Sequence, residues 1–342
     1  MPERVVELSR ELNAIAEEKI RGIERVTSKA RLLALNALIE SVHAGQHGVG
    51  FAVVAREVGE VSKAIDELST SLTKELAGRT NELDRLGSQL VADVRGTRLA
   101  DLARNAIELI DRNLYERSCD VRWWATDSAA VDACADPTDA TTSYASHRLG
   151  VILDSYTVYL DLWLADASGR VIANGRPERY PGVIGLDVSG SDWFRAAADT
   201  RSGEEYAVAD VEANNALGGK AVATYAAMVR EGGDANGRPI GALGIFFDWE
   251  EQANQIVTGL PLNDEERTRT RCLLVDSGHR VIAASDGRGL LTERFQLETG
   301  GAARGYVTRP NGDTVGFCLT PGYETYQGLG WYGVLVQGPA RR

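Results

Sequence analysis

Two aspartates and a group of aromatic residues in the second half of the chain have the chemistry of a small-molecule pocket. Carboxylates hold an amine or a cation, and aromatic rings wall a pocket and attract positive groups. The candidate ligand-binding residues are Trp193, Phe194, Tyr206, Asp210, Tyr225 and Asp248. Each aspartate is equally consistent with an ordinary turn or strand-end position, so both interpretations stay open.

A metal centre is disfavoured. His43 and His47 are four residues apart, a spacing that places two ligands on one helix face. Glycines at 45 and 48 put this pair in a bend, however, and no cysteine or third histidine lies near it. The four cysteines form no C-x-x-C pair, which favours reduced thiols in the cytoplasm. We expect no metal and no cofactor.

Catalysis, nucleic-acid binding and membrane insertion are disfavoured as well. The sequence contains no nucleophile elbow, P-loop, H-E-x-x-H motif or kinase signature, so we expect a protein that is not an enzyme. A net charge of −12 without a basic stripe argues against nucleic acid as a partner. No apolar run approaches the ~20 residues of a membrane span. The N-terminus opens into a charged helical pattern without a signal peptide, so we expect a cytoplasmic protein.

The N-terminal part has the pattern of a coiled coil. Apolar residues keep a seven-residue repeat from Val5 to about Ala44 and again from Val54 to Leu90. The glycine-rich stretch 43–50 between them permits a chain reversal, which predicts an antiparallel helical hairpin. We expect a second copy to bury the apolar seam in a four-helix bundle. The second helix should continue as a stalk to Trp124 or further.

The remaining chain predicts an α+β fold. Strand patterns and helical patterns alternate after a loop at 137–143. The predicted strands are 159–164, 171–173, 220–229 and 240–248, and the predicted helices are 145–154 and 189–200. The residue pattern from Leu164 to Ala173 recurs from Leu274 to Ala283. Further strands at 306–309, 314–319 and 331–336 then complete a second sheet in tandem with the first.

The bend region resembles the signalling tip of methyl-accepting chemotaxis proteins. The similarity lies in the runs Leu32–Glu40 and Gly48–Val58, with Ala44-Gly45 between them. It implies contact with the chemotaxis coupling adaptor and histidine kinase through Leu32, Leu35, Asn36 and Val53. Glu40 and Glu57 match positions used between neighbouring receptor dimers and complete the candidate adaptor- and kinase-binding set.

Several positions depart from the family pattern. Ser28, Lys29, Ala30 and Arg31 replace the usual Phe, Gln, Thr and Asn before the matching run, and His43, Gln46 and Val49 replace residues of the bend. In the family some of these residues hold dimers together in trimers, so the trimer-facing positions are partly replaced here. Both helices are also shorter than in a full receptor.

Residues from about 95 to 337 resemble a double Cache domain, a long dimerising helix followed by two PAS-like subdomains. The similarity rests on Asp192-Trp193-Phe194 opening a helix, Asp210 before a strand, a glycine-containing strand that ends in Asp248, and the tandem repeat. It implies that the first subdomain binds a small ligand, with Asp248 at the position that takes an amino group. Ser191 stands where the amino-acid-binding branch has Arg, the usual bidentate partner of a carboxylate.

These observations divide the chain into four segments. They are a chemotaxis-transducer signalling hairpin at 1–94 with its tip at 43–50, stalk and dimerisation helices at 95–155, a ligand-binding Cache subdomain at 156–268 and a second Cache subdomain at 269–342. We expect a soluble, homodimeric sensor of an amine or amino-acid-like molecule that signals to the adaptor and kinase. The alternative is a non-signalling dimeric scaffold or ligand-binding module with a degenerate receptor hairpin.

Overall fold

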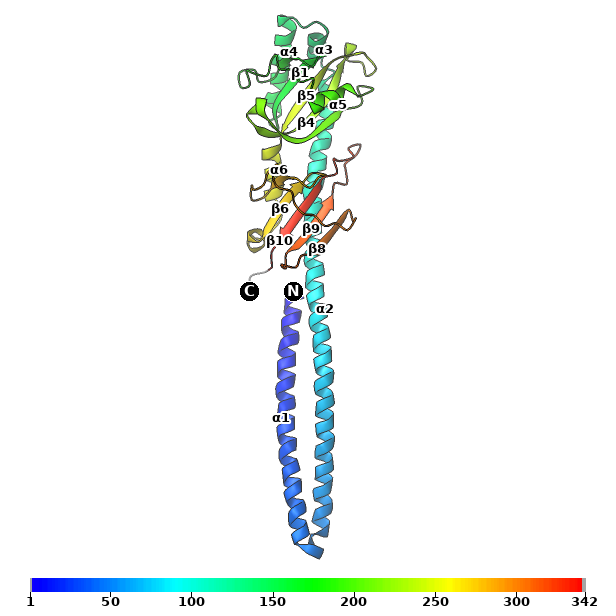
Figure 1. The fold of residues 1–342 in the computed structure, drawn as a ribbon, viewed down its shortest axis with the longest axis vertical. Helices are drawn as coiled ribbons and strands as arrows, with labels where there is room; N and C mark the ends of the chain where they lie inside the picture. The colour runs from blue at the N-terminus through cyan, green and yellow to red at the C-terminus, as the bar shows by residue number, and fades with distance from the viewer. Residues whose placement is uncertain (1, 340–342) are drawn as a thin grey trace. The chain divides into compact units, whose positions relative to one another are not determined.

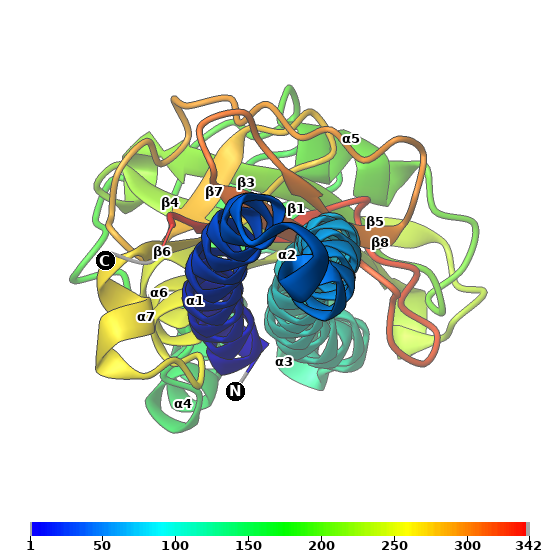
Figure 2. The same cartoon turned by 90° about the horizontal axis from the view of Figure 1, so that it is seen from below.

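A computed structural model describes residues 2–339, which fall into two compact units, Met1–Arg95 and Gly96–Arg342. The first unit is a pair of helices. Helix α1 spans Pro2–His43, a short 3-10 turn η1 spans Gly45–Gly48, and helix α2 spans Val49–Trp124, of which the residues to Arg95 belong to this unit. Figures 1 and 2 show the two helices of this unit side by side, and the chain reverses between them. The predicted antiparallel hairpin is confirmed.

Cross-helix contacts fix how the two helices pair. Arg10 lies 3.6 Å from Asp84 and Arg31 lies 3.8 Å from Asp66, so α1 residues nearer the bend face α2 residues nearer the bend. The bend requires glycine. Gly45 has φ +56°, and a Cβ at Gly48 would lie 2.1 Å from the carbonyl oxygen of Ser41.

The face between the two helices differs from the predicted apolar seam. It is lined mainly by small residues with a seven-residue spacing, and its buried members include Ile20, Thr27, Ala34, Ser41, Ala55, Ser62 and Ser69. Small side chains allow the helices to approach closely. Large residues of the predicted seam remain exposed in the single chain, among them Leu12 at 65%, Val26 at 69% and Leu33 at 69%.

The second unit contains two five-stranded antiparallel sheets. The first has the order β2-β1-β5-β4-β3 and the second has the order β7-β6-β10-β9-β8. The strands are β1 Tyr159–Asp166, β2 Val171–Asn174, β3 Ala207–Asn214, β4 Lys220–Arg230, β5 Pro239–Asp248, β6 Thr270–Val275, β7 Val281–Ala284, β8 Arg304–Thr308, β9 Thr314–Leu319 and β10 Tyr332–Gln337. The helices after α2 are α3 Ser128–Ala135, α4 Asp139–Ser155, α5 Asp192–Ala198, α6 Trp249–Thr258 and α7 Asp264–Thr268. The predicted α+β class is confirmed.

The sequence repeat corresponds to a structural repeat. Leu164 pairs with Ala173 in the first sheet as Leu274 pairs with Ala283 in the second, and an irregularity in the register follows in both. The shared aspartate shapes the turn. Asp166 accepts hydrogen bonds from the backbone N–H groups at 168 and 170, and Asp276 accepts the same pair from 278 and 280. The aspartates of the repeat therefore close the first hairpin of each sheet.

The two faces of the first sheet pack differently. One face, with Leu162, Tyr225 and Phe247, belongs to the core cluster that includes α2. The other face, with Trp163 and Phe246, is covered by the segment 175–219 that contains α5. The rings of Trp163 and Phe246 lie 4.0 Å apart between centroids. Both faces are therefore buried, which explains the nearly continuous apolar runs of β4 and β5.

Several elements differ from the predictions. The sequence patterns missed strand β3 and helix α3, and α4 begins at Asp139, inside the predicted loop, because Thr138 and Thr141 form a capping box. Helix α5 is shorter than expected, and Ser191 at its N-cap makes no side-chain cap hydrogen bond. The α2 helix ends at Trp124, the nearer limit of the predicted range. Within residues 2–339, no helix is long and apolar enough to cross a membrane.

Candidate functional site

The candidate adaptor- and kinase-binding residues are all solvent-exposed. The apolar members Leu32, Leu35 and Val53 are 61%, 53% and 57% exposed. The polar members Asn36, Glu40 and Glu57 are exposed as well. Apolar side chains so accessible near a helical bend are available for a protein partner. Phe51, which the sequence analysis did not single out, is the most exposed of them at 74%.

The candidate ligand-binding residues are distributed over three places in the second unit. Trp193 and Asp210 line a cavity of about 480 Å³ beside α5 and β3. Phe194 packs against Trp193 with ring centroids 5.8 Å apart, and both rings are buried. Burial raises the pKa of Asp210, whose Oδ1 accepts the N–H of Val211 at 2.8 Å. Two of the six candidates, Trp193 and Asp210, therefore line this cavity, and Phe194 packs behind Trp193.

The two tyrosines lie on the other face of the sheet. Tyr206 and Tyr225 stack with ring centroids 6.0 Å apart, and the Tyr225 hydroxyl donates to Tyr326 at 3.3 Å. Burial raises the pKa of Tyr225 well above its ordinary value. The strand periodicity explains the separation, because Tyr225 points opposite to Thr224, which lines the cavity beside α5.

Asp248 lines a third cavity, of about 410 Å³, together with Lys220 and Glu250. Burial raises the pKa of Asp248, and its Oδ1 is buried without a hydrogen-bond partner among the described residues. Lys220 pairs instead with Glu250, at 3.2 Å. The structure thus separates the two aspartates that the sequence analysis considered together.

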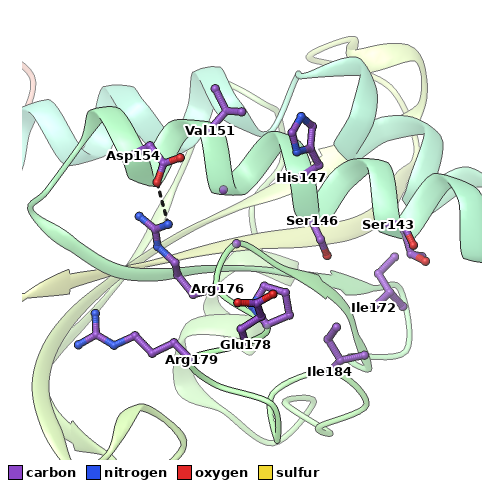
Figure 3. Close-up of a pocket in the computed structure, with 14 residues that line it drawn as sticks. Ser143, Ser146, His147, Val151, Asp154, Ile172, Arg176, Glu178, Arg179 and Ile184 are labelled. Atoms are coloured by element: carbon purple, nitrogen blue, oxygen red, sulfur yellow. Dashed lines mark hydrogen bonds and ion pairs between the residues drawn. The ribbon is translucent and has the colours of Figure 1, made fainter.

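A larger cavity, of about 720 Å³, lies between α4 and the segment 175–184 after β2. Figure 3 shows Ser146 and Asp154 on α4 facing Arg176 and Glu178 across it, and His147 of α4 also lines the cavity. We call it the α4 groove. Sequence reasoning missed these residues because they belong to no motif and come from a helix and a loop that only the fold brings together.

Two glycines bring the walls of the α4 groove together. A Cβ at Gly175 would lie 2.5 Å from a methyl carbon of Leu153 and 3.1 Å from the backbone of Leu149, both on α4. A Cβ at Gly150 would lie 3.2 Å from the carbonyl oxygen of Gly175. The missing side chains therefore let α4 lie directly on the end of β2.

The buried carboxylate of Asp161 holds the start of the segment 175–184, which forms one wall of the α4 groove. Its Oδ1 accepts the N–H groups of Leu162 at 2.9 Å and Arg176 at 3.0 Å. Its Oδ2 accepts the indole N–H of Trp163 at 3.0 Å and the amide of Asn174 at 2.7 Å. Burial raises the pKa of Asp161, and these four hydrogen bonds oppose that effect.

A separate polar contact joins α2 to the second sheet. The loop between β9 and β10, residues 320–331, is here called the joint loop. Buried Asp111 of α2 accepts the hydroxyl of Thr320 at 2.6 Å and the N–H of Gly322 at 2.9 Å. Tyr323 packs edge-on against Tyr115 of α2, and Tyr326 receives the hydrogen bond from Tyr225. The joint loop therefore contacts both the stalk helix and the first sheet.

The helical hairpin is similar in sequence to a known family of signalling domains. Residues 3–111 match the methyl-accepting chemotaxis protein (MCP) signalling domain. The biofilm dispersion protein BdlA of Pseudomonas aeruginosa is 33% identical over 90 residues, which are 26% of this chain and 20% of BdlA. PilJ of the same organism is 37% identical over 113 residues, 32% of this chain and 16% of PilJ. The chain thus spans a fifth or less of these relatives, and the matched family is one of signalling receptors.

Solved structures show the fold of the remainder. The sensor domain of the Vibrio cholerae histidine kinase DctB has a TM-score of 0.53 at 13% identity, over 71% of this chain and 96% of that domain. The ligand-binding domain of the Pseudomonas aeruginosa amino-acid chemoreceptor PctC, in complex with GABA, has a TM-score of 0.50 at 18% identity, over 71% and 99%. The two tandem sheets are those of Cache-type sensor domains, as predicted.

Proposed function

We propose that the chain is a chemotaxis-type signal transducer, in which the Cache-type unit binds a small molecule and the hairpin tip contacts a coupling adaptor and a histidine kinase. The observation that carries this proposal is the combination of a match to the MCP signalling domain over residues 3–111 with a sensor-type fold in the same chain. PctC, a protein of the same fold, is a chemoreceptor with a ligand bound in this domain.

The exposed tip supports the proposed partners. Leu32, Leu35 and Val53 offer apolar area, and Asn36 offers a side-chain amide that can hydrogen-bond across an interface. A homodimer is part of the proposal, because the exposed Leu12, Val26 and Leu33 need a partner to bury them. We place the protein in the cytoplasm, where the adaptor and kinase are found.

A binding assay with the purified adaptor and kinase tests the proposal. The intact chain should retain both proteins, and Asn36→Ala with Val53→Ala should weaken retention about tenfold or more, since interface anchors are worth about 1–2 kcal/mol or more each. Asn81→Ala, which removes an exposed asparagine of α2 away from the bend, is the matched control and should bind normally.

The opposite result favours the alternative function. A protein that forms dimers but binds neither adaptor nor kinase would be a scaffold or ligand-binding module with a degenerate hairpin. Equal binding by the tip variants and the intact chain would show that these positions are not the contact surface.

A further inference from the structure

Helix α2 is the covalent link between the hairpin and the two sheets, so a signal from the sheets reaches the hairpin through it. It is one continuous helix of 76 residues. Buried polar contacts tie it to the sheets at two places. Tyr159 of β1 donates directly to Asp120 at 2.6 Å. Asp111 accepts from the joint loop, which belongs to the second sheet and also contacts the first.

The joint loop contacts the first sheet through Tyr326. Tyr225 of β4 donates to its hydroxyl at 3.3 Å, and both rings are buried. Tyr225 also stacks on Tyr206, which directly precedes β3, and pairs with Val208 of that strand. The same strand carries Asp210, which lines the cavity beside α5. A change in β3 therefore reaches the joint loop through the two stacked tyrosines.

The other end of the joint loop holds α2. The carboxylate of Asp111 is 2% exposed and has two donors in the loop, the hydroxyl of Thr320 and the N–H of Gly322. Tyr323 packs edge-on against Tyr115, one turn further along α2, with ring centroids 5.4 Å apart. A buried carboxylate that loses its donors is costly, so α2 and this end of the loop move together.

The joint loop also has the features of a segment that can change its conformation. Three of its glycines have positive φ, and so does Glu324, at +51°. A residue other than glycine is strained in this left-handed region. The hydrogen bond between the two tyrosine hydroxyls is long, so little is lost when it breaks. The direct contact from Tyr159 to α2 is shorter and goes to a carboxylate, which makes it the stronger of the two.

We propose that the joint loop is the switch that couples the first sheet to α2. With the hydrogen bond between Tyr225 and Tyr326 made, the loop holds α2 through Asp111, and breaking that bond releases the helix. The inference rests on the proposed signalling function and deepens it by naming the contact that regulates the hairpin. A ligand of the first sheet then acts by favouring one of the two loop arrangements.

Hydrogen–deuterium exchange of the full chain tests the coupling without the kinase. Tyr225→Phe removes the hydroxyl that donates to Tyr326 and keeps the ring. We expect the amides of the joint loop and of α2 residues 111–115 to exchange about fivefold faster, because a buried hydrogen bond contributes about that factor. Tyr144→Phe, which removes a hydroxyl from an exposed tyrosine of α4, is the matched control and should exchange like the unaltered chain.

A double variant shows whether the effect passes through Asp111. Thr320→Val removes one of its donors and keeps the shape of the side chain. Effects of independent contacts multiply, whereas contacts in one linked network do not. We therefore expect Tyr225→Phe and Thr320→Val together to accelerate exchange in α2 by clearly less than the product of their separate factors.

The kinase assay with the adaptor measures the output of the switch. Tyr225→Phe should change the effect of the chain on the autophosphorylation rate about fivefold, the factor expected for the lost hydrogen bond. Tyr159→Phe removes the direct contact to Asp120 and should change it less.

Three results would overturn the assignment. They are unchanged exchange of α2 in Tyr225→Phe, a double variant whose factors multiply, and a larger effect of Tyr159→Phe than of Tyr225→Phe on the kinase rate. If the unaltered chain leaves the kinase rate unchanged, the proposed signalling function fails. The exchange measurements then still decide whether the joint loop couples the first sheet to α2.

Discussion

At the scale of single residues, Asp161 shows how a buried charge can serve a site that it does not enter. It is fully buried and accepts four hydrogen bonds, one of them from the backbone of Arg176 in the groove wall. Breaking one side of such a network leaves the other donors unsatisfied. The carboxylate therefore acts as a positioning group for Arg176.

Asp161→Ala should lower the free energy of unfolding by about 3 kcal/mol or more, because several buried donors lose their acceptor at once. Denaturant unfolding measures this change. Asp187→Ala is a useful comparison, since Asp187 also accepts a backbone N–H at 2.9 Å, from Ser189, but in an exposed turn. It should cost far less, and equal effects of the two variants would contradict the positioning role.

A second prediction for a single residue concerns how the stability of the fold decreases at acid pH. The hydrogen bond from Arg271 lowers the pKa of Glu293, so folding favours the ionised carboxylate. The folded-state pKa lies below the unfolded value, so the stabilisation is complete above about pH 4.5 and is lost as pH falls through the lowered folded-state pKa.

Glu293→Gln should therefore reduce the stability loss between neutral pH and the acid range, while lowering stability at neutral pH itself. Urea unfolding midpoints at a series of pH values measure both effects. If stability falls as steeply with decreasing pH in the variant as in the unaltered chain, this pair contributes nothing to the pH dependence.

At the scale of elements, the sequence predicted those with strong periodicity or a turn signature. The heptad repeat and the glycine-rich bend predicted the hairpin, and the strands β4, β5 and β9 follow from β-branched and aromatic runs. The sequence did not predict strand β3 because Asp210, Glu212 and Asn214 interrupt its apolar pattern. Its pairing with β4 also shifts register between Ala209 and Glu212. The small residues that line the face between the two helices were not singled out from the sequence, because the seven-residue repeat of large apolar residues marks the exposed face instead.

The two candidate sites also differ in whether the sequence alone predicts them. The tip residues carry a contiguous local pattern, so the sequence alone identified them. The α4 groove combines a helix with a loop more than twenty residues further along the chain, and its walls meet through Gly150 and Gly175. No local sequence pattern predicts that this helix and loop are in contact. The charged side chains of the groove are, in the sequence, indistinguishable from ordinary surface residues.

The joint loop offers an element-scale prediction. Asp111→Asn should destabilise the second unit by about 1–3 kcal/mol, because an amide accepts through only one oxygen and places a donor beside Gly322 N–H. Denaturant unfolding measures the loss. Glu108→Gln, one turn away and partly exposed, is the matched control and should stay within about 0.5 kcal/mol. Equal effects would show that the contact to the joint loop is not stabilising.

At the scale of the whole molecule, the exposed seam of the hairpin predicts self-association. Leu33 on α1 and Leu68 on α2 are each 69% exposed, and apolar side chains exposed in such numbers along a helix pair are typical of an interface. Leu33→Asp combined with Leu68→Asp should convert a dimer into a monomer in sedimentation velocity, with the Cache-type unit still folded. A dimer that persists in this variant would place the contact elsewhere.

The most direct test of the transducer account is the autophosphorylation rate of the histidine kinase, reconstituted with the coupling adaptor and the full chain. We predict that the chain changes this rate. The Asn36→Ala, Val53→Ala variant should not change it, while Asn81→Ala should behave like the unaltered chain. A kinase rate that is the same with and without the chain would contradict the proposed signalling function.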